Sequence, residues 1–389
     1  MQFLIILFSI IIVMNLMCSI FGQGNYPAEV FLEQDDLFFL NVYNAAVYKS
    51  FSRSELMLKC FFKILPMALF VVSMNSARAA DEEQERMEIQ QPIIDMVFKE
   101  KWSKLDTLFS SYVNGFPSTS NGTHKLILAY LAVTDNNVSK PDGGESTADD
   151  WLKANPDSTV AMMLKASSYS SKAFYLRGEG AAETVDEDVW PKFKALIEQE
   201  KSYLLKHKNI ADKDPMWYQL MISVARNLND HELLMKTLEE GSQKYPTYQN
   251  IYLDAMEGSL PKWGGSPELV EKIAQLAASR TSAQSGKSYY SYVWYNALSF
   301  QPEMMELLDA GQIISWETMK TGWHDRYKAY PTPQIATEYM TTACLAQDEK
   351  GFTEGYSWVN NQYGELVEQV WLRNMSYNRC ADFFRSKHK

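Results

Sequence analysis

The sequence predicts an all-α protein, built as an array of antiparallel helix pairs. Three observations carry this prediction. After residue 80, apolar residues recur at three- and four-residue steps, which places them on one face of a helix. Capping side chains precede proline at Asp214-Pro215 and Ser266-Pro267, a pattern typical of helix starts. No convincing run of alternating apolar and polar residues predicts a strand.

Composition indicates a globular protein that does not bind nucleic acid. Of 389 residues, 46% are apolar and 22% are charged, with 48 acidic and 37 basic side chains and a net charge of −11. A disordered chain would contain fewer apolar residues. Nucleic-acid binding depends on Lys and Arg neutralising phosphates, so the acidic balance argues against DNA or RNA as the main partner.

The first eighty residues contain two apolar stretches of different kinds. Residues 3–21 carry no charge and have about the length of a bilayer span. In residues 57–79, Lys59 and Lys63 come before a short apolar run that is followed by Ala77-Arg78-Ala79. Basic start, short apolar core and small residues at the end form the pattern of a secretory signal peptide, with cleavage after Ala79.

The position of this signal peptide bears on where the chain starts. Signal peptides stand at the beginning of a chain, so translation is predicted to start at Met57, with residues 1–56 as an upstream extension of the gene model. The mature chain, residues 80–389, would then be periplasmic in a Gram-negative host or secreted, and would not span a membrane. The alternative is a true start at Met1, which would make both apolar stretches membrane segments and the protein membrane-anchored.

Helical spacing predicts the elements of the mature chain in order. The stripe from Ile94 to Tyr112 fits one helix or two short consecutive helices. Polar stretches at 136–150, 178–188 and 279–288 are predicted to be loops. The remaining predicted helices are 124–133, 158–176, 190–205, 215–228, 231–244, 248–256, 267–278, 289–300, 333–346 and 350–363.

An internal repeat supports helix pairs. Alignment of Pro215 with Pro333 matches a small residue ten positions on, then a polar turn and a second apolar stripe. This is the pattern of a helix-turn-helix repeat, and it resembles the tetratricopeptide repeat in degenerate form. The alternative is that an ordinary helical bundle gives these matches by chance. The matched pairs are Ala225 with Ala343, Asp230 with Asp348, Leu234 with Phe352, and Leu238 with Tyr356.

Three local signatures add a family resemblance to about residues 151–295. They are Leu176-Arg177-Gly178, the segment 214–217 that ends in Trp217, and the Pro-Lys-Trp-Gly-Gly-Ser motif at 261–266. A tyrosine-rich segment, 289–295, follows the motif. In this order they resemble a bacterial domain-of-unknown-function family of α-helical proteins. The resemblance implies a helical fold and brings no activity with it.

These signatures also provide candidate binding residues. Lys262, Trp263 and the two following glycine N–H groups would form a ligand-binding corner at a helix N-terminus. The structural alternative is a tight glycine turn, with Ser266 capping the next helix and Trp263 filling the adjacent groove. Arg177 has a similar alternative, as a helix cap or the partner of a buried carboxylate. The residues expected to contact a ligand or partner are Arg177, Trp217, Lys262, Trp263, Tyr289, Tyr292 and Trp294.

The sequence contains no recognised catalytic or metal-binding motif. No two of the five histidines are near one another, and His-Glu-x-x-His, Cys-x-x-Cys and Gly-x-Ser-x-Gly are absent. We therefore predict no catalytic residues, no metal and no cofactor. Cys344 and Cys380 lie in the mature chain and would pair in an oxidising compartment, joining the C-terminal helix to the last repeat. The alternative is two buried cysteines that do not meet.

Together these observations predict an exported helical-repeat protein whose groove binds a protein or peptide partner, because stacked helix pairs form extended surfaces. The first alternative is an enzyme of unrecognised class, with His324 or His231 beside a carboxylate in a helical groove. The second is a purely structural component of the bacterial envelope.

Overall fold

The structure, a computed structural model, describes residues 82–138, 142–178, 180–310, 313–361 and 366–388. The upstream extension and the signal peptide predicted at 1–56 and 57–79 lie outside these residues. Residues 81–389 belong to one compact unit. None of the helices in the described ranges is long and apolar enough to cross a membrane.

The described residues form helices connected by turns and short irregular segments, which confirms the all-α prediction. Their only strand-like pairing is an isolated bridge between Ser118 and His124. The α-helices are α4 (Glu82–Phe98), α5 (Trp102–Gly115), α6 (Lys125–Val138), α7 (Glu145–Ala154), α8 (Thr159–Arg177), α9 (Val189–Lys206), α10 (Lys208–Ala211), α11 (Met216–Asn227), α12 (His231–Lys244), α13 (Gln249–Gly258), α14 (Pro267–Ser285), α15 (Ser288–Phe300), α16 (Glu306–Ala310), α17 (Trp316–Ala329), α18 (Pro333–Leu345), α19 (Glu349–Asn361) and α20 (Tyr377–Lys387). Four 3₁₀ helices join them: η1 (Ala182–Thr184), η2 (Pro261–Trp263), η3 (Pro302–Met305) and η4 (Glu368–Val370).

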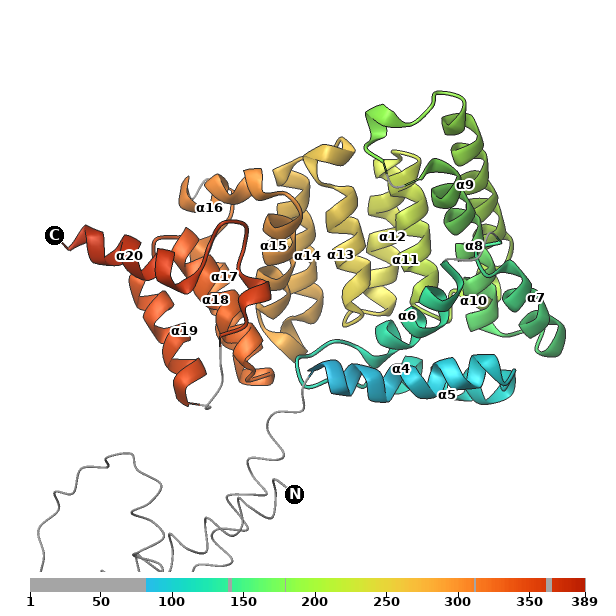
Figure 1. Ribbon diagram of the computed structural model, residues 1–389, viewed down its shortest axis with the longest axis horizontal. Coiled ribbons are helices and arrows are strands. Elements are labelled where there is room, and N and C mark those ends of the chain that lie inside the picture. Colours follow the sequence, from blue (N-terminus) through green and yellow to red (C-terminus); the bar gives the residue numbers. More distant parts are fainter. Residues whose placement is uncertain (1–81, 139–141, 179, 311–312, 362–365, 389) are drawn as a thin grey trace, which may run out of the picture. The chain divides into compact units, whose positions relative to one another are not determined.

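Helices that follow one another along the chain pack against one another. α8 packs on α9, α11 on both α12 and α13, α14 on α15, and α18 on α19. Figure 1 shows α11 to α15 side by side, with α4 and α5 crossing beneath the neighbouring α6. The order of the helices in space therefore largely follows their order in the sequence.

Two predicted loops are partly helical. α7 begins at Glu145, inside the predicted loop 136–150, and α14 continues to Ser285, inside the predicted loop 279–288. The extension of α14 is polar, yet Thr281 is fully buried and its hydroxyl donates a hydrogen bond to the Ala277 carbonyl. A side chain that satisfies itself within the helix removes the local reason for a loop.

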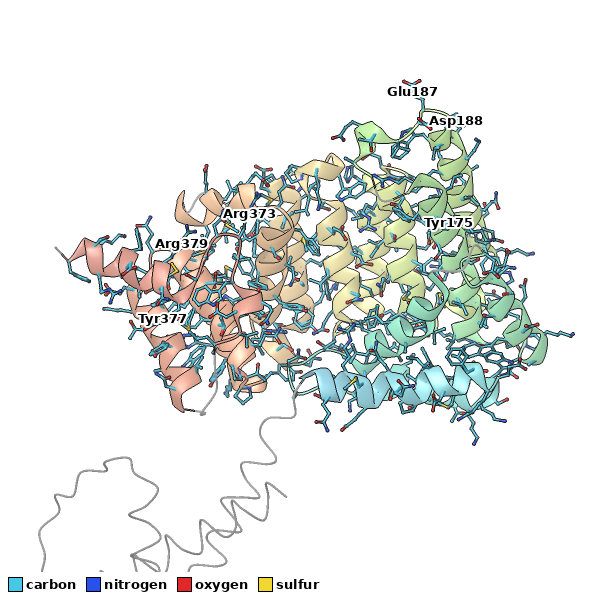
Figure 2. The ribbon with its side chains drawn as sticks, viewed as in Figure 1. Tyr175, Glu187, Asp188, Arg373, Tyr377 and Arg379 are labelled. Atoms are coloured by element: carbon cyan, nitrogen blue, oxygen red, sulfur yellow. A yellow bond between two sulfur atoms is a disulfide. The ribbon has the colours of Figure 1, made fainter. Side chains whose placement is uncertain are left out.

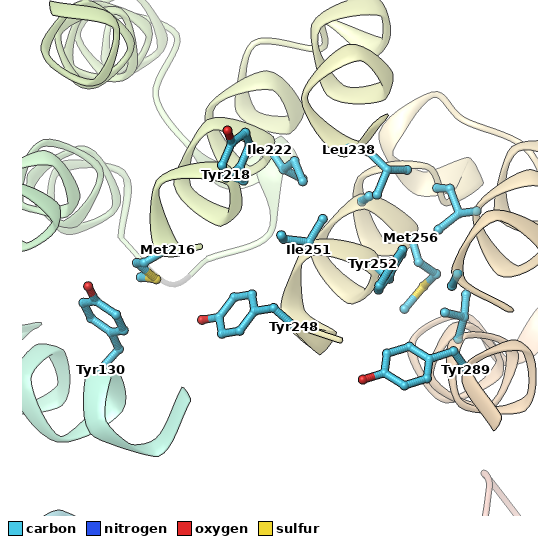
Figure 3. Packing of buried hydrophobic residues seen from close by; sticks show 14 of the residues in the cluster. Tyr130, Met216, Tyr218, Ile222, Leu238, Tyr248, Ile251, Tyr252, Met256 and Tyr289 are labelled. Carbon is cyan, nitrogen blue, oxygen red and sulfur yellow. The ribbon is translucent and has the colours of Figure 1, made fainter. Parts of the chain in front are cut away.

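Buried aromatic rings fill much of the core, and several of the buried tyrosines have hydrogen-bonded hydroxyl groups. Figure 3 shows Tyr130, Tyr248 and Tyr252 among aliphatic side chains of α11 to α13. The Tyr248 hydroxyl donates to Gln219 Oε1 at 2.9 Å, and the Tyr252 hydroxyl to the Pro246 carbonyl at 2.9 Å. Buried tyrosines keep their ring area out of water without leaving a hydroxyl unsatisfied.

The segments aligned by Pro215 and Pro333 have the same turn geometry. Asn229 and Gln347 both have a φ of 56°, in the left-handed region. The next residue donates its N–H back at 2.8 Å in each case, from Asp230 to Ala225 and from Asp348 to Ala343. The connections α11–α12 and α18–α19 are therefore equivalent in backbone conformation.

Cys344 in α18 and Cys380 in α20 form a disulfide, with their Cα atoms 5.9 Å apart. Both residues are buried. The bond joins two helices that are separated by residues 362–365, which the structure does not describe. It ties the C-terminal helix to the helical unit.

Candidate functional site

A cavity of about 520 Å³ lies among four parts of the helical unit. Its walls are the 116–124 segment before α6, the start of α13, the α14–α15 junction and the end of α17. Cavities of this volume are typical of small-ligand and peptide side-chain sites. It is therefore the candidate functional site.

The 116–124 segment is fastened to helices that are distant in sequence. Gln249 Nε2, at the start of α13, donates to the Gly122 carbonyl at 2.7 Å. Gly122 has a φ of 86°, and a Cβ atom there would lie 2.7 Å from the ring of Tyr330. Only glycine fits this close approach, which brings the segment against the end of α17.

The α14–α15 junction is built around a second glycine. Gly286 has a φ of 55°, and a Cβ atom there would lie 2.1 Å from Asp325 Oδ2. The same carboxylate oxygen accepts the N–H of Lys287 at 2.8 Å. The side chain of Lys287 supplies no capping hydrogen bond to α15. The N-terminus of α15 therefore lies at the cavity with Asp325 as the carboxylate beside it.

Arg326 carries a buried positive charge in the cavity wall. Its side chain is 4% exposed, and its guanidinium carbon lies 4.0 Å from the ring centroid of Tyr292. Nη2 donates a long hydrogen bond of 3.4 Å to the Asn121 carbonyl. Within the described ranges, Nε has no hydrogen-bond partner and the guanidinium forms no ion pair.

His124 and Tyr289 meet at one backbone carbonyl. His124 Nε2 lies 2.6 Å from the Thr247 oxygen, and the Tyr289 hydroxyl donates to that oxygen at 2.5 Å. Burial lowers the pKa of His124, while the hydrogen bond to the Thr247 carbonyl acts in the opposite direction. Burial raises the pKa of Tyr289. A carbonyl only accepts, so both side chains serve as donors that hold the cavity wall.

Of the seven binding residues predicted from the sequence, Tyr289 lines this cavity. Tyr292 is not among the lining residues, but its ring lies against the guanidinium of Arg326, which does line it. Trp294, from the same helix, is fully buried, and its Nε1 donates to Glu271 at 2.7 Å. Because α15 has aromatic side chains on every face, only some of them can face the cavity.

The other four lie elsewhere. Arg177 ends α8, and its guanidinium carbon lies 5.7 Å from the ring centroid of Trp190. Tyr175, two residues earlier in the same helix, is 64% exposed (Figure 2). Trp217 is buried in α11, and its Nε1 donates to the Leu204 carbonyl. Lys262 lies 5.4 Å from the ring of Phe300. Trp263 lies against the guanidinium of Arg226.

The Pro-Lys-Trp-Gly-Gly-Ser corner at 261–266 has the features of the structural alternative. Gly264 has a φ of 77°, and a Cβ atom on Gly265 would lie 2.0 Å from the Ser259 carbonyl oxygen. The Ser266 hydroxyl accepts the N–H of Leu269 and caps α14. The guanidinium of Arg226 covers the Trp263 ring at 5.5 Å. These contacts give Trp263, Gly264, Gly265 and Ser266 structural roles.

The histidines considered for an enzyme site are not at the cavity. His324 Nε2 lies 3.1 Å from Glu354 Oε2 rather than against the adjacent Asp325, and both side chains are well exposed. His231 lies near Gly264, at the 261–266 corner. In the described part of the chain, no cluster of three or more His, Cys, Asp or Glu side chains could hold a metal ion.

Sequence reasoning missed most of the cavity residues. Arg326, His124 and Gln249 belong to no motif, and α17 was not among the predicted helices. Gly122 and Gly286, in loop-like polar stretches, were the only local signal. Nothing in the local pattern brings residues 116–124 to residues 325–330.

The fold and the cavity define an all-helical protein with a partly open polar site between its helices. A family model described as a domain of unknown function (DUF4034) matches residues 89–250. This range contains Arg177 and Trp217 and ends before the 261–266 motif. No curated protein and no solved structure matches the chain.

Proposed function

We propose that this protein is an exported helical-repeat protein, and that its cavity binds a segment of a protein or peptide partner. The observation that carries the proposal is the cavity itself, a partly open space of about 520 Å³ with both aromatic and polar walls. Such a mixture suits a peptide, which offers apolar side chains together with polar backbone and end groups.

The proposal includes a repeat architecture of the tetratricopeptide type, which would suit a protein or peptide partner. The α11–α12 and α18–α19 connections share their turn geometry, as expected for two copies of one helix-turn-helix unit. Stacked units of this kind form long surfaces on which extended segments bind. Three of the four cavity walls, at the start of α13, the α14–α15 junction and the end of α17, lie between these two hairpins in the sequence.

Export is supported by the signal-peptide pattern at 57–79 and by the disulfide, since disulfides persist in oxidising compartments. Intact mass of the protein from its native host tests this part. A mature chain that starts at Ala80 is expected. A chain that retains Met1 would instead indicate the membrane-anchored alternative.

The enzyme alternative requires a histidine within hydrogen-bonding reach of a carboxylate inside a cavity. His324 and Glu354 make such a contact, but on an exposed surface. His124 lies at the cavity, but its Nε2 donates to a backbone carbonyl. These arrangements favour binding over catalysis.

Site-specific photo-crosslinking in the native host tests the binding proposal. A photoreactive amino acid replaces Ala329, an exposed residue of the cavity wall, and a control variant carries it at Leu205, which is 51% exposed on α9. Ala329 is expected to give crosslinks to one defined partner segment, and a synthetic copy of that segment should bind the purified chain. Equal crosslinking from both positions would contradict the proposal.

A further inference from the structure

Arg326 carries a positive charge in a buried place, where the surrounding groups compensate that charge only in part. A guanidinium cannot lose its proton at physiological pH, and burial without a partner is costly. The ring of Tyr292 at 4.0 Å and the long hydrogen bond to the Asn121 carbonyl compensate in part. The Nε–H remains without a partner.

A second source of positive potential faces the same space. α15 has thirteen residues, and its first residues, Ser288 and Tyr289, line the cavity. The N-terminus of a helix carries partial positive charge and orients N–H groups outward. Lys328 adds a charge at the rim, where solvent screens it more strongly.

We infer that the cavity binds a carboxylate group of the partner peptide, with Arg326 as the residue that recognises it. Nε and Nη2 form one edge of the guanidinium, and a carboxylate pairs with such an edge through two parallel hydrogen bonds. The bound group would satisfy the Nε–H that the protein leaves unpaired. This inference rests on the proposed function for the source of the carboxylate, which is a C-terminus or an acidic side chain.

Asp325 favours a carboxylate over a phosphate. Its own carboxylate lines the cavity and is held there by the N–H of Lys287. A phosphate dianion would meet twice the repulsion from Asp325 and twice the attraction to Arg326, so the one buried guanidinium of the lining would leave one of its two negative charges uncompensated. Because Asp325 already accepts an N–H at the start of α15, the guanidinium of Arg326 is the main positive charge that a bound carboxylate would meet.

The Nε–H resonance of Arg326 provides a direct test. In ¹H–¹⁵N spectra of the purified full chain, the arginine Nε–H signal that is lost in Arg326→Lys is assigned to Arg326. Titration with N-acetyl-trialanine is expected to move this signal downfield to saturation, whereas the matching C-terminal amide binds at least tenfold more weakly. Equal shifts from the acid and the amide, or no shift from the acid, would overturn the inference.

Two variants separate recognition from general charge. Arg326→Lys keeps the charge but loses the planar edge, so affinity for N-acetyl-trialanine is expected to fall about tenfold. Lys328→Gln removes the same charge from the rim and is expected to change affinity less than about twofold. Thermal unfolding checks that both variants are folded. An equal loss in the two variants would contradict a specific role for Arg326.

Titrations with acetate and with inorganic phosphate distinguish between the possible sources of the bound anion. Acetate that saturates the Arg326 signal as tightly as the peptide would support carboxylate recognition and count against a peptide partner. Phosphate that binds more tightly than either would overturn the carboxylate assignment. If the Ala329 crosslinks are found but the acid and the amide bind equally, the proposed function stands and this inference fails.

Discussion

Two arginines of this protein lie against aromatic rings, and their surroundings differ in one respect. Arg226, at the 261–266 corner, covers Trp263 and pairs with Glu257 at 2.5 Å. Arg326, at the cavity, lies against Tyr292 and has no ion pair among the described residues. The conspicuous sequence motif lies beside the arginine that is paired with a carboxylate, although the Nε of both arginines has no hydrogen-bond partner in the described part of the chain. A buried guanidinium without an ion pair, more than a motif, marks the candidate site.

The largest expected effect tests whether the 261–266 corner is structural. Gly265→Ala places a Cβ atom against the Ser259 backbone carbonyl, which cannot move aside as a side chain would. We expect a loss of about 3 kcal/mol in the free energy of unfolding, measured with urea. Affinity of the folded protein for N-acetyl-trialanine should be unchanged.

Gly115→Ala is the matched control. A Cβ atom there meets only Pro117 Cδ, at 3.8 Å. We expect a change within about 0.5 kcal/mol. If both glycine variants lose the same amount of stability, the close approach at Gly265 does not limit stability. The 261–266 corner beside Arg226 could then no longer be described as structural.

Glu200 is a buried acid that can become neutral by binding a proton, whereas the buried guanidinium of Arg326 stays charged. It is 1% exposed, and burial raises its pKa to about 8, although a hydrogen bond from Ser170 acts against the rise. The folded state therefore binds a proton that the unfolded state, with a pKa near 4.3, releases. Stability is expected to fall as pH rises from about 5 to about 8, by roughly 2 kcal/mol between pH 6 and pH 8.

Urea unfolding across this pH range measures the slope, and Glu200→Gln should flatten it because glutamine does not titrate. A slope that is identical in the variant would show that Glu200 does not bind the proton. The contrast with Arg326 is chemical: a buried acid neutralises itself with a proton, whereas a guanidinium needs an anion.

A smaller effect is expected where the arginine is paired. Glu257→Gln removes the charge that faces Arg226, and both side chains are partly exposed, at 15% and 27%. Solvent screens this pair, so we expect a loss of about 1 kcal/mol in stability. A double-mutant cycle with Arg226→Gln isolates the coupling, and a coupling energy near zero would remove the distinction between Arg226 and Arg326.

The smallest effect is expected at Lys262, which the sequence motif singled out. Its ammonium lies against the exposed ring of Phe300. Its backbone N–H donates a hydrogen bond to Gln301 Oε1. Lys262→Ala should change stability by less than about 0.5 kcal/mol and leave carboxylate affinity unchanged. A tenfold loss of affinity would move the binding site to the 261–266 corner.

The sequence was informative where a local pattern carries the physics. Stripes of apolar residues identified α8, α11 and α18 because burial of one face drives those helices. α17 was missed because Met319 and Trp323 are buried between polar and charged neighbours, which leaves a weak stripe. The cavity could not be predicted, because residues between 116 and 330 meet there only through tertiary packing. The cysteines were visible, but whether they pair depends on the approach of α20 to α18.

The 116–124 segment has a mechanical consequence. It is bonded to α13 through Gln249, to α17 through Arg326, and to α18 through Gln334. A segment that is hydrogen-bonded at three points along a stack of helices opposes bending of that stack, because bending changes the distances between the three points. A ligand that holds the cavity walls in place would therefore also oppose bending of the stack.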